Sequence, residues 1–288
     1  MGAHMAMIPF EELDQQLERR FDRFVGHLRL DDPTAAAEEF ARTCQWLRSS
    51  ELRLPRRTMA AFMEGWVELF WQCRRHDLML EAAEAAVQTF GPDPEWAFAR
   101  GEALFNLGRF DDARETLSPL THEDFDEPMV YYLLGCIAER RGETEDASRL
   151  FQAAHRLDPK TFRRPVPISE EKTLRLFETC IADLPEPVAH ALKELPIFVS
   201  PLPRDDLIHQ FNPPLDPLVM GVFFGQPRGE EPSSWPEDQP RIHLFHRNIA
   251  KLAADFPTLN EELRKTLFHE FGHYLGYDED QLDQMGLA

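Results

Sequence analysis

Two histidines and a glutamate near the C-terminal end have the residue types and the spacing of a helical zinc site, His269-Glu270-x-x-His273. On a helix that rises about 1.5 Å per residue, positions four apart lie about 6 Å from each other along one face. Both imidazoles can therefore bind one tetrahedral ion. Glu270 lies beside them, where a carboxylate can act on water at that ion. The three residues together indicate metal-assisted hydrolysis.

The flanking sequence predicts that these residues lie on a helix. Thr258 with Glu261 three residues later has the spacing of a capping box at its start. Gly276 stands where a helix ends in the left-handed conformation, which would turn the chain back towards the metal. An apolar face at helical spacing lies between these ends: Leu259, Leu263, Leu267, Phe271 and Leu275. The alternative is a pair of solvated histidines on an amphipathic helix.

The residues that follow extend the motif to His269-Glu270-x-x-His273-x-x-Gly276-x-x-Glu279. An acidic residue occupies the place at which the extended metzincin pattern has its third histidine. Residues 169–288 resemble the minimal zincin-like metallopeptidases, a family of compact bacterial domains with H-E-x-x-H-x-x-G-x-x-D and a short tail. The rest of the resemblance lies in residues 218–225, 241–247 and 283–287. The chain departs from it in having Glu279 where that family usually has Asp.

The resemblance implies a catalytic zinc site with three protein ligands, His269, His273 and Glu279, and water in the open fourth position. Glu270 would be the general base, which takes a proton from this water and passes it to the leaving amine. The predicted cofactor is Zn²⁺, although iron, nickel or cobalt can use the same donors. Three neighbouring carboxylates stay open as the third ligand: Asp278, Asp280 and Asp283.

Several further side chains are candidates for the same cleft. His243 and His246 could act as oxyanion donors, although a histidine beside a strand is more often structural. Tyr274 and Tyr277 are candidates of the same kind. Met285 either packs beneath the metal or fills the core.

An internal repeat occupies the N-terminal half. Six residues recur 34 positions later in one register: Gly101, Leu104, Gly108, Ala113, Leu117 and Leu120 as Gly135, Ala138, Gly142, Ala147, Phe151 and Ala154. The period and the pattern of small and large residues resemble tetratricopeptide repeats. A degenerate copy precedes them, with packing positions at Trp66, Cys73, Ala82 and Ala86. We expect about three helical pairs, capped by a first hairpin, whose groove binds a peptide or a protein partner.

The basic, proline-containing stretch Lys160–Ser169 lacks periodicity and predicts a linker. Two helical stretches near residues 170–184 and 188–195 follow it. Three apolar runs then predict strands: Pro196–Ser200, Leu218–Phe224 and Arg241–Phe245. The last of them is our candidate for the edge strand that holds an extended substrate by main-chain hydrogen bonds in zincins.

The predicted fold is therefore α followed by α+β, in a chain of 288 residues that is long enough for two cores. We expect a tetratricopeptide-like α-solenoid at residues 6–160. A small zincin-like domain with a short β-sheet and an active-site helix should follow at residues 169–288.

Composition excludes several classes of partner. The net charge of −20, from 31 Lys and Arg against 51 Asp and Glu, argues against nucleic acid and anionic membranes, which require clustered positive charge. The longest apolar run, near residues 219–224, is too short to cross a bilayer. Four scattered cysteines without C-x-x-C spacing fit reduced thiols, so we expect a cytoplasmic protein. The sequence contains no glycine-rich phosphate-binding motif, so we do not expect a nucleotide cofactor.

These observations favour a cytoplasmic zinc-dependent peptidase that acts on a peptide or protein substrate recruited by its repeats. The alternative is a protein-interaction module in which the repeats carry the function and the zincin-like domain holds metal without peptidase activity. Glu270 discriminates between the two, because a purely structural zinc site has no use for a carboxylate beside its ligands.

Overall fold

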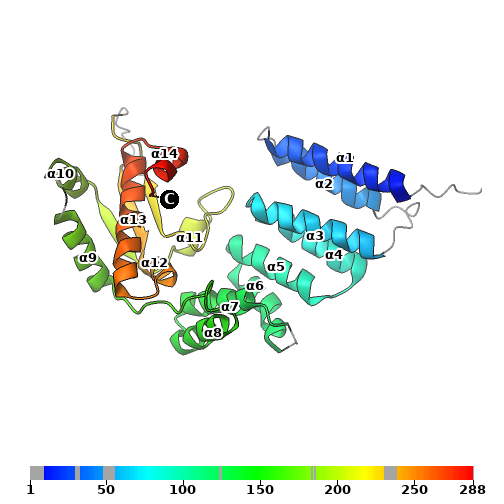
Figure 1. Ribbon diagram of the computed structural model, residues 1–288, viewed down its shortest axis with the longest axis horizontal. Helices are drawn as coiled ribbons and strands as arrows, with labels where there is room; N and C mark the ends of the chain where they lie inside the picture. The colour runs from blue at the N-terminus through cyan, green and yellow to red at the C-terminus, as the bar shows by residue number, and fades with distance from the viewer. Residues whose placement is uncertain are drawn as a thin grey trace, which may run out of the picture. The chain divides into compact units, whose positions relative to one another are not determined.

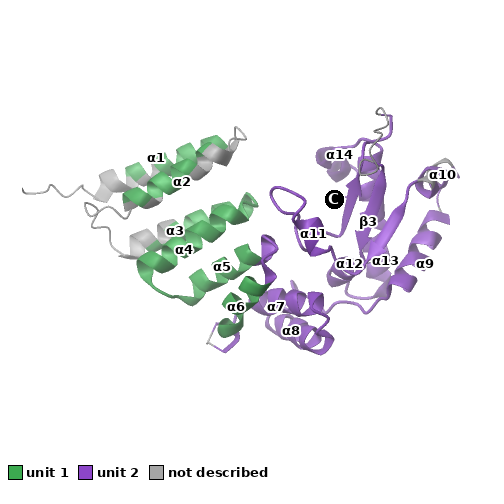
Figure 2. Ribbon diagram, turned by 180° about the vertical axis from the view of Figure 1, so that it is seen from behind, with its two compact units in different colours: residues 1–104, 111–120 green, residues 105–110, 121–288 purple. Residues whose placement is uncertain are grey.

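The structure is a computed structural model that describes residues 10–29, 33–47, 56–122, 125–182, 184, 186–229 and 239–287. Two compact units divide the chain (Figure 2). Unit 1 consists of Met1–Leu104 and Asp111–Leu120, and unit 2 of Phe105–Phe110 and Thr121–Ala288. The domain limits expected from the sequence, 6–160 and 169–288, stay a prediction beside this contact-based division.

Helices account for the described regular structure before residue 160 (Figure 1). Three helical pairs are in extensive contact: α1 (Phe10–Arg29) with α2 (Pro33–Leu47), α3 (Arg56–Gln72) with α4 (His76–Phe90), and α7 (Pro128–Arg140) with α8 (Thr144–Leu157). Between them lie α5 (Pro94–Asn106), α6 (Phe110–Leu117) and a short 3-10 helix (Ser118–His122). The predicted helical repeat architecture is confirmed. Part of the predicted first hairpin, residues 30–32 and 48–50, lies outside the described residues.

The 34-residue repeat has a direct cause in packing. Helices α5 and α7 begin 34 residues apart, and so do α6 and α8. A Cβ atom added at Gly101 would lie 2.4 Å from Leu117, and one added at Gly135 would lie 2.9 Å from Phe151. Each glycine therefore lets the second helix of its pair approach closely, and the equivalent large side chain fills the space.

An aromatic cluster forms the core of the first helices in unit 1. Trp66 is fully buried, and its ring meets that of Phe24 edge to face with 4.6 Å between centroids. Phe40 and Phe70 complete the cluster. Cys73, which we predicted to be a packing position, is exposed instead. The reason is that α3 ends at Gln72, so Cys73 falls in the following turn.

Unit 2 contains a three-stranded sheet in the order β1-β3-β2. Strand β1 (Ile197–Ser200) runs parallel to β3 (Arg241–Phe245), and β2 (Gly221–Phe224) runs antiparallel to it. All three predicted strands are present, two of them shortened. The prediction that Arg241–Phe245 is the substrate-holding edge strand is wrong, because this strand is central and pairs on both sides. The edges belong to β1 and β2.

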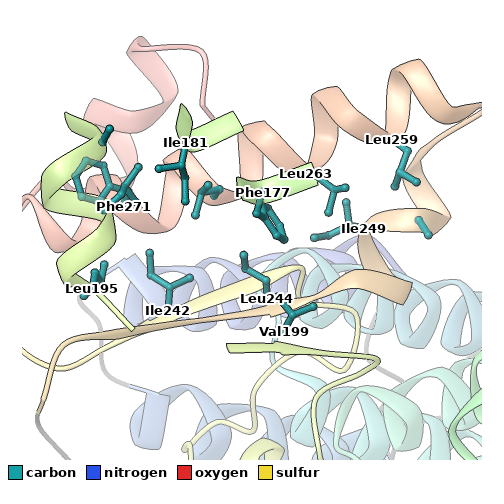
Figure 3. Close-up of a cluster of buried hydrophobic side chains, with 14 of the residues drawn as sticks. Phe177, Ile181, Leu195, Val199, Ile242, Leu244, Ile249, Leu259, Leu263 and Phe271 are labelled. Atoms are coloured by element: carbon teal, nitrogen blue, oxygen red, sulfur yellow. The ribbon is translucent and has the colours of Figure 1, made fainter. Parts of the chain in front are cut away.

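Helices that precede β1 in the sequence and helices that follow β3 cover one face of this sheet. They are α9 (Glu170–Ala182), α10 (Glu186–Glu194), α12 (His246–Leu252) and α13 (Phe256–Tyr274), with the short α11 (Asp205–Ile208) and α14 (Glu279–Gln284) outside them. Figure 3 shows Val199, Ile242 and Leu244 of the sheet directed at side chains of these helices. Their partners include Phe177, Ile249, Leu259, Leu263 and Phe271. This core fixes α13 on the sheet.

The predicted linker, Lys160–Ser169, is irregular but packed within unit 2. The Val166 amide donates a hydrogen bond to the Ala250 carbonyl oxygen (3.1 Å), and the Arg163 guanidinium donates to Leu252 O (2.7 Å). Phe162 and Val166 are buried. The stretch is therefore an integral wall of the unit.

Among the described helices, none combines the length and the apolar character that crossing a membrane requires.

Truncation of a core residue of α13 tests this packing. Leu263 is fully buried, so Leu263→Ala should lower the free energy of unfolding of unit 2 by about 2–5 kcal/mol through lost burial and an unfilled cavity. Urea denaturation of metal-free protein measures the change. The control is Leu174→Ala on α9, whose side chain is 39% exposed and should change the value by about 0.5 kcal/mol or less. Equal losses in both variants would contradict the assigned core.

Candidate metal centre

Helix α13 brings His269, Glu270 and His273 together, as the spacing predicts. Its start differs from the expected one. The N-cap is Asp255, whose carboxylate accepts hydrogen bonds from the Thr258 amide (3.0 Å) and the Thr258 hydroxyl (2.7 Å). Thr258 therefore lies inside the first turn, and the predicted Thr258/Glu261 capping box is wrong. Asp255 competes better for the cap because its carboxylate satisfies free amide groups of the first turn.

The helix ends at the predicted glycine. Gly276 has φ +89°, in the left-handed region. The Tyr277 amide donates to Gly272 O and the Gly276 amide to His273 O, each at 3.0 Å, which is the pairing of a Schellman motif. The chain thus reverses immediately after the second histidine. This reversal brings the next acidic residues back along α13.

Helix α14 then packs against α13 through one contact. A Cβ atom on Gly272 would lie 2.3 Å from the Leu282 side chain, which is fully buried. Glu279, the first residue of α14, lies three residues before Leu282 and therefore near the same helical face. The N-cap is Asp278, and its carboxylate accepts a hydrogen bond from the Gln281 amide (2.9 Å) in a capping box. The cap occupies Asp278 and leaves Glu279 at the histidines.

Three possible donor atoms converge at this point. His269 Nε2 and His273 Nε2 are 3.0 Å apart, and Glu279 oxygens lie 3.6 Å from the first and 3.3 Å from the second. Donors that share a tetrahedral ion at about 2.0–2.1 Å are separated by about 3.3 Å. The three separations lie around this value. Within the described part of the chain, this is the one cluster of His, Cys, Asp or Glu residues that could hold an ion.

The hydrogen bonds of the imidazoles define which nitrogens face the cluster. His269 Nδ1 lies 3.0 Å from Leu287 O, and His273 Nδ1 lies 3.1 Å from Tyr277 O. A carbonyl oxygen only accepts, so each Nδ1 carries the hydrogen, and a lone pair at Nε2 is what each imidazole offers to an ion. Two lone pairs and a carboxylate that face one another repel unless a cation lies between them. The residues therefore fit a divalent metal, with the backbone orienting both histidines.

Glu270 has an environment unlike that of Glu279. It is buried against β2, where a Cβ atom on Gly221 would lie 2.8 Å from its side chain. Burial raises the pKa of Glu270 to about 8; a hydrogen bond from the Phe223 amide acts in the opposite direction, and the charge of Glu279 adds to the rise. A cation at the adjacent cluster would lower this pKa, since it favours the charged carboxylate. Glu270 is thus placed to exchange a proton.

The remaining candidates lie outside the cluster. His243 is on β3 between the rings of Phe198 and Phe224, and His246 is buried at the start of α12. Burial lowers the pKa of both histidines. Tyr274 packs against Phe223 and Phe271. Met285 is 56% exposed after α14, so it neither fills the core nor packs beneath the metal.

Sequence reasoning missed four contributors to the site. Gly221 and Gly272 act by having no side chain, so that Glu270 and Leu282 can approach. Gly221 lies within residues 218–225 and Gly272 between the two histidines. A glycine inside a strand or a helix is the sequence signal for such a close approach. The carbonyl groups of Tyr277 and Leu287 carry no sequence signal, because every residue has a carbonyl.

Comparison with known proteins agrees with this geometry. Residues 192–287 match a family model described as zincin-like metallopeptidase, and residues 80–135 match one described as tetratricopeptide repeat. The chain therefore contains a zincin-like domain preceded by a tetratricopeptide repeat. A solved structure, "MamA AMB-1 P212121", is 19% identical over 55% of this chain and 78% of its own, with a TM-score of 0.34. No curated protein matches the sequence.

The contact between Gly272 and Leu282 can be tested by adding one methyl group. Gly272→Ala should displace α14 and with it Glu279, since the added Cβ atom would lie 2.3 Å from the fully buried Leu282 side chain. We expect the affinity for a divalent metal to fall about tenfold or more, as it does when supporting residues of metal sites are changed. Competition with a chelator, with Zn²⁺ as the test ion, measures it. Gly65→Ala, where nothing lies within 4 Å, is the control, and equal affinities in both variants would refute this role.

Proposed function

We propose that this chain is a zinc-dependent metallopeptidase that hydrolyses peptide bonds in a substrate recruited through its helical repeats. One observation carries the proposal. Two imidazoles, each with its Nδ1 atom at a backbone carbonyl oxygen, and one carboxylate converge at separations of 3.0–3.6 Å, beside a second, buried carboxylate. The match of residues 192–287 to zincin-like metallopeptidases supports it.

His269, His273 and Glu279 would hold the ion. Their two nitrogens and one oxygen suit Zn²⁺, and three protein ligands leave the open position of a catalytic rather than a structural site. When bound, zinc supplies Lewis acidity, which polarises a carbonyl group and makes water a better nucleophile near neutral pH. Their side chains are 21%, 25% and 74% exposed, so substrate can reach this centre.

Glu270 would move the proton. Its carboxylate lies next to the ligand cluster without belonging to it, and the hydrogen bond from the Phe223 amide orients it. In the first step it accepts a proton from water, and in the second it gives that proton to the leaving amine. Its burial excludes bulk solvent from this exchange.

Strand β2 is the edge that would align the substrate. The Phe245 amide donates to Met220 O at 2.8 Å, so alternate residues of the β2 segment direct their backbone groups at β3. Gly221 and Phe223 alternate with those residues, so their backbone groups point away from β3, at the outer edge of β2. At this edge the Phe223 amide donates its hydrogen bond to Glu270. An extended peptide that pairs with this edge would bring its main chain to the base.

The helical repeats would supply the second half of the function. The match of residues 80–135 to a tetratricopeptide repeat supports a role in protein interaction. A stack of helical pairs presents an extended concave surface, which suits a peptide or a protein. The alternative function, an interaction module whose zincin-like domain holds metal without peptidase activity, leaves the position and burial of Glu270 without a purpose.

Metal content tests the ligands. Protein purified without chelator or nickel resin should contain about one equivalent of zinc. His269→Ala and Glu279→Ala remove donors of the cluster and should lose most of this metal on dialysis. Asp280→Ala is the matched control, because Asp280 follows Glu279 on α14 but lies outside the cluster. Mass spectrometry measures the content. Retention in Glu279→Ala with loss in Asp280→Ala would assign the third ligand to Asp280.

Activity tests Glu270. Glu270→Gln keeps the size of the side chain but removes the proton acceptor, so the rate on a peptide library should fall at least about a hundredfold while the metal stays bound. Glu261→Gln changes an exposed glutamate of the same helix and should leave the rate unchanged. Product formation is followed by mass spectrometry. Full activity of Glu270→Gln would contradict the role of Glu270 as the base and would favour the alternative, a protein-interaction module.

A further inference from the structure

A pocket of about 710 Å³ lies within unit 2, away from the metal centre. Residues of α7, α8, α9 and α12 line it, together with the irregular stretch from Arg164 to Ser169. Its size is that of pockets that bind ligands in proteins, about 300–1,000 Å³. None of the residues assigned to the proposed peptidase site takes part in it.

The pocket is largely preformed. Its wall, the stretch around Val166, is fixed by the hydrogen bond from the Val166 amide to Ala250 O (3.1 Å). Pro165 and Pro167 on either side lack amide hydrogens, and the amide between them is already used. An extended ligand therefore finds no free amide donor along residues 165–167. Side chains have to provide the donors in this part of the wall.

Apolar side chains contribute to the lining. Phe151 and Ala147 of α8 are buried, as are Val166 and Ala250. These residues can accept one or two apolar side chains of a ligand. Burial of apolar area provides about 25 cal/mol per Å², which is the main source of affinity that this part offers.

The charged groups of the pocket have a positive balance. Arg164, Lys172 and Arg247 line it, against one carboxylate, that of Glu139. The Glu139 oxygens are already paired: Oε2 lies 2.6 Å from Lys251 Nζ, and Oε1 lies 3.3 Å from Arg247. The side chains of Lys251 and Glu139 are both buried, so water screens their attraction little. The positive charge of the other cations therefore has no counterpart in the lining.

This balance is opposite to that of the chain as a whole, which has a net charge of −20. Lys172 is held at the pocket by its position over the Phe256 ring, with Nζ 3.4 Å from the ring centre. Arg164 and Lys172 are exposed, so they do not form the enclosed donor set that binds an isolated, strongly hydrated anion. A ligand must combine negative charge with apolar area.

We propose that this pocket binds an acidic peptide segment that contains apolar residues. The apolar side chains occupy the surface of Phe151 and Ala147, and the flanking carboxylates pair with Arg164 and Lys172, the two cations of the lining that Glu139 leaves unpaired. Such a site would hold a protein through an acidic segment at a distance from the bond to be cleaved. It does not depend on the proposed peptidase activity, because binding here needs neither metal nor Glu270.

Fluorescence anisotropy of labelled peptides tests the site on the full chain. The test peptide is Asp-Glu-Leu-Phe-Glu-Asp with a fluorescein label, at about 0.15 M salt, where charges beyond about 8 Å are screened. Glu270→Gln protein is used so that the peptide stays intact. We expect saturable binding that weakens when Leu and Phe are replaced by Gly, and no binding of the peptide with Lys in place of the acidic residues.

A charge-reversed pair of variants places this binding in the pocket. Arg164→Glu with Lys172→Glu should weaken it at least about tenfold, since two attractive pairs become repulsive. Arg156→Glu with Lys160→Glu makes the same change of net charge on exposed residues outside the lining and should have little effect. Ser148→Trp, which fills the pocket from α8 without changing charge, should also abolish binding. Circular dichroism confirms that each variant is folded.

Four results would overturn the proposal. Three are the absence of saturable binding by the unaltered pocket, equal weakening by both charge-reversed pairs, and equal binding of the Lys peptide. The fourth is unchanged binding in Ser148→Trp, which would place the peptide on another surface. Because no step requires catalysis, each result is independent of whether the chain is a peptidase.

Discussion

Two backbone carbonyl groups orient both histidines of the candidate metal centre. Tyr277 O and Leu287 O each accept a hydrogen bond from the Nδ1 of one histidine, which leaves two lone pairs only 3.0 Å apart at the Nε2 atoms. Without a cation this arrangement is unfavourable, and with one it is a ligand set that costs little reorganisation. Both carbonyls belong to the segment after α13. The turn at Gly276 and helix α14 therefore form a frame for the histidines as well as the source of the third donor.

The proposed role of Glu270 requires a buried carboxylate, whereas that of Glu279 requires an exposed one. A ligand carboxylate gains from an exposed position where it can reach an ion, whereas a proton-transferring carboxylate gains from a dry one that brings its pKa nearer to neutral. The sheet meets this requirement by burial, since Gly221 lets the side chain lie against β2, and the hydrogen bond from the Phe223 amide, which by itself lowers the pKa, orients the carboxylate. The same free edge is where an extended peptide would pair. In the proposed mechanism, substrate alignment and proton transfer would thus both depend on one strand of four residues, Gly221–Phe224.

Local features were predictable from the sequence, and long-range ones were not. The spacing of His269 and His273 fixed their common helical face, and the 34-residue period fixed the pairing of helices, because both follow from geometry within one element or one hairpin. The order of the strands depends on which segments meet after the chain folds, so the central position of Arg241–Phe245 was not readable from its apolar pattern. The pocket in unit 2 was still less predictable, since its lining residues Glu139, Arg164 and Arg247 are far apart in the sequence. The start of α13 was readable but misread, because Asp255 followed closely by Pro257 is itself a helix start.

The position of the Glu279 carboxylate beside the histidines follows from how α14 is held. Asp278 is the N-cap, and its Oδ1 atom and its amide are both engaged by Gln281, which ties its side chain to the start of α14, outside the candidate ligand cluster. Packing of Leu282 on Gly272 then sets the distance between α14 and α13. At this distance the side chain of Glu279, which is one methylene longer than Asp, brings its oxygens to 3.3 and 3.6 Å from the two histidines. The N-cap, the glycine contact and the length of the glutamate side chain thus together place a carboxylate at the two histidines.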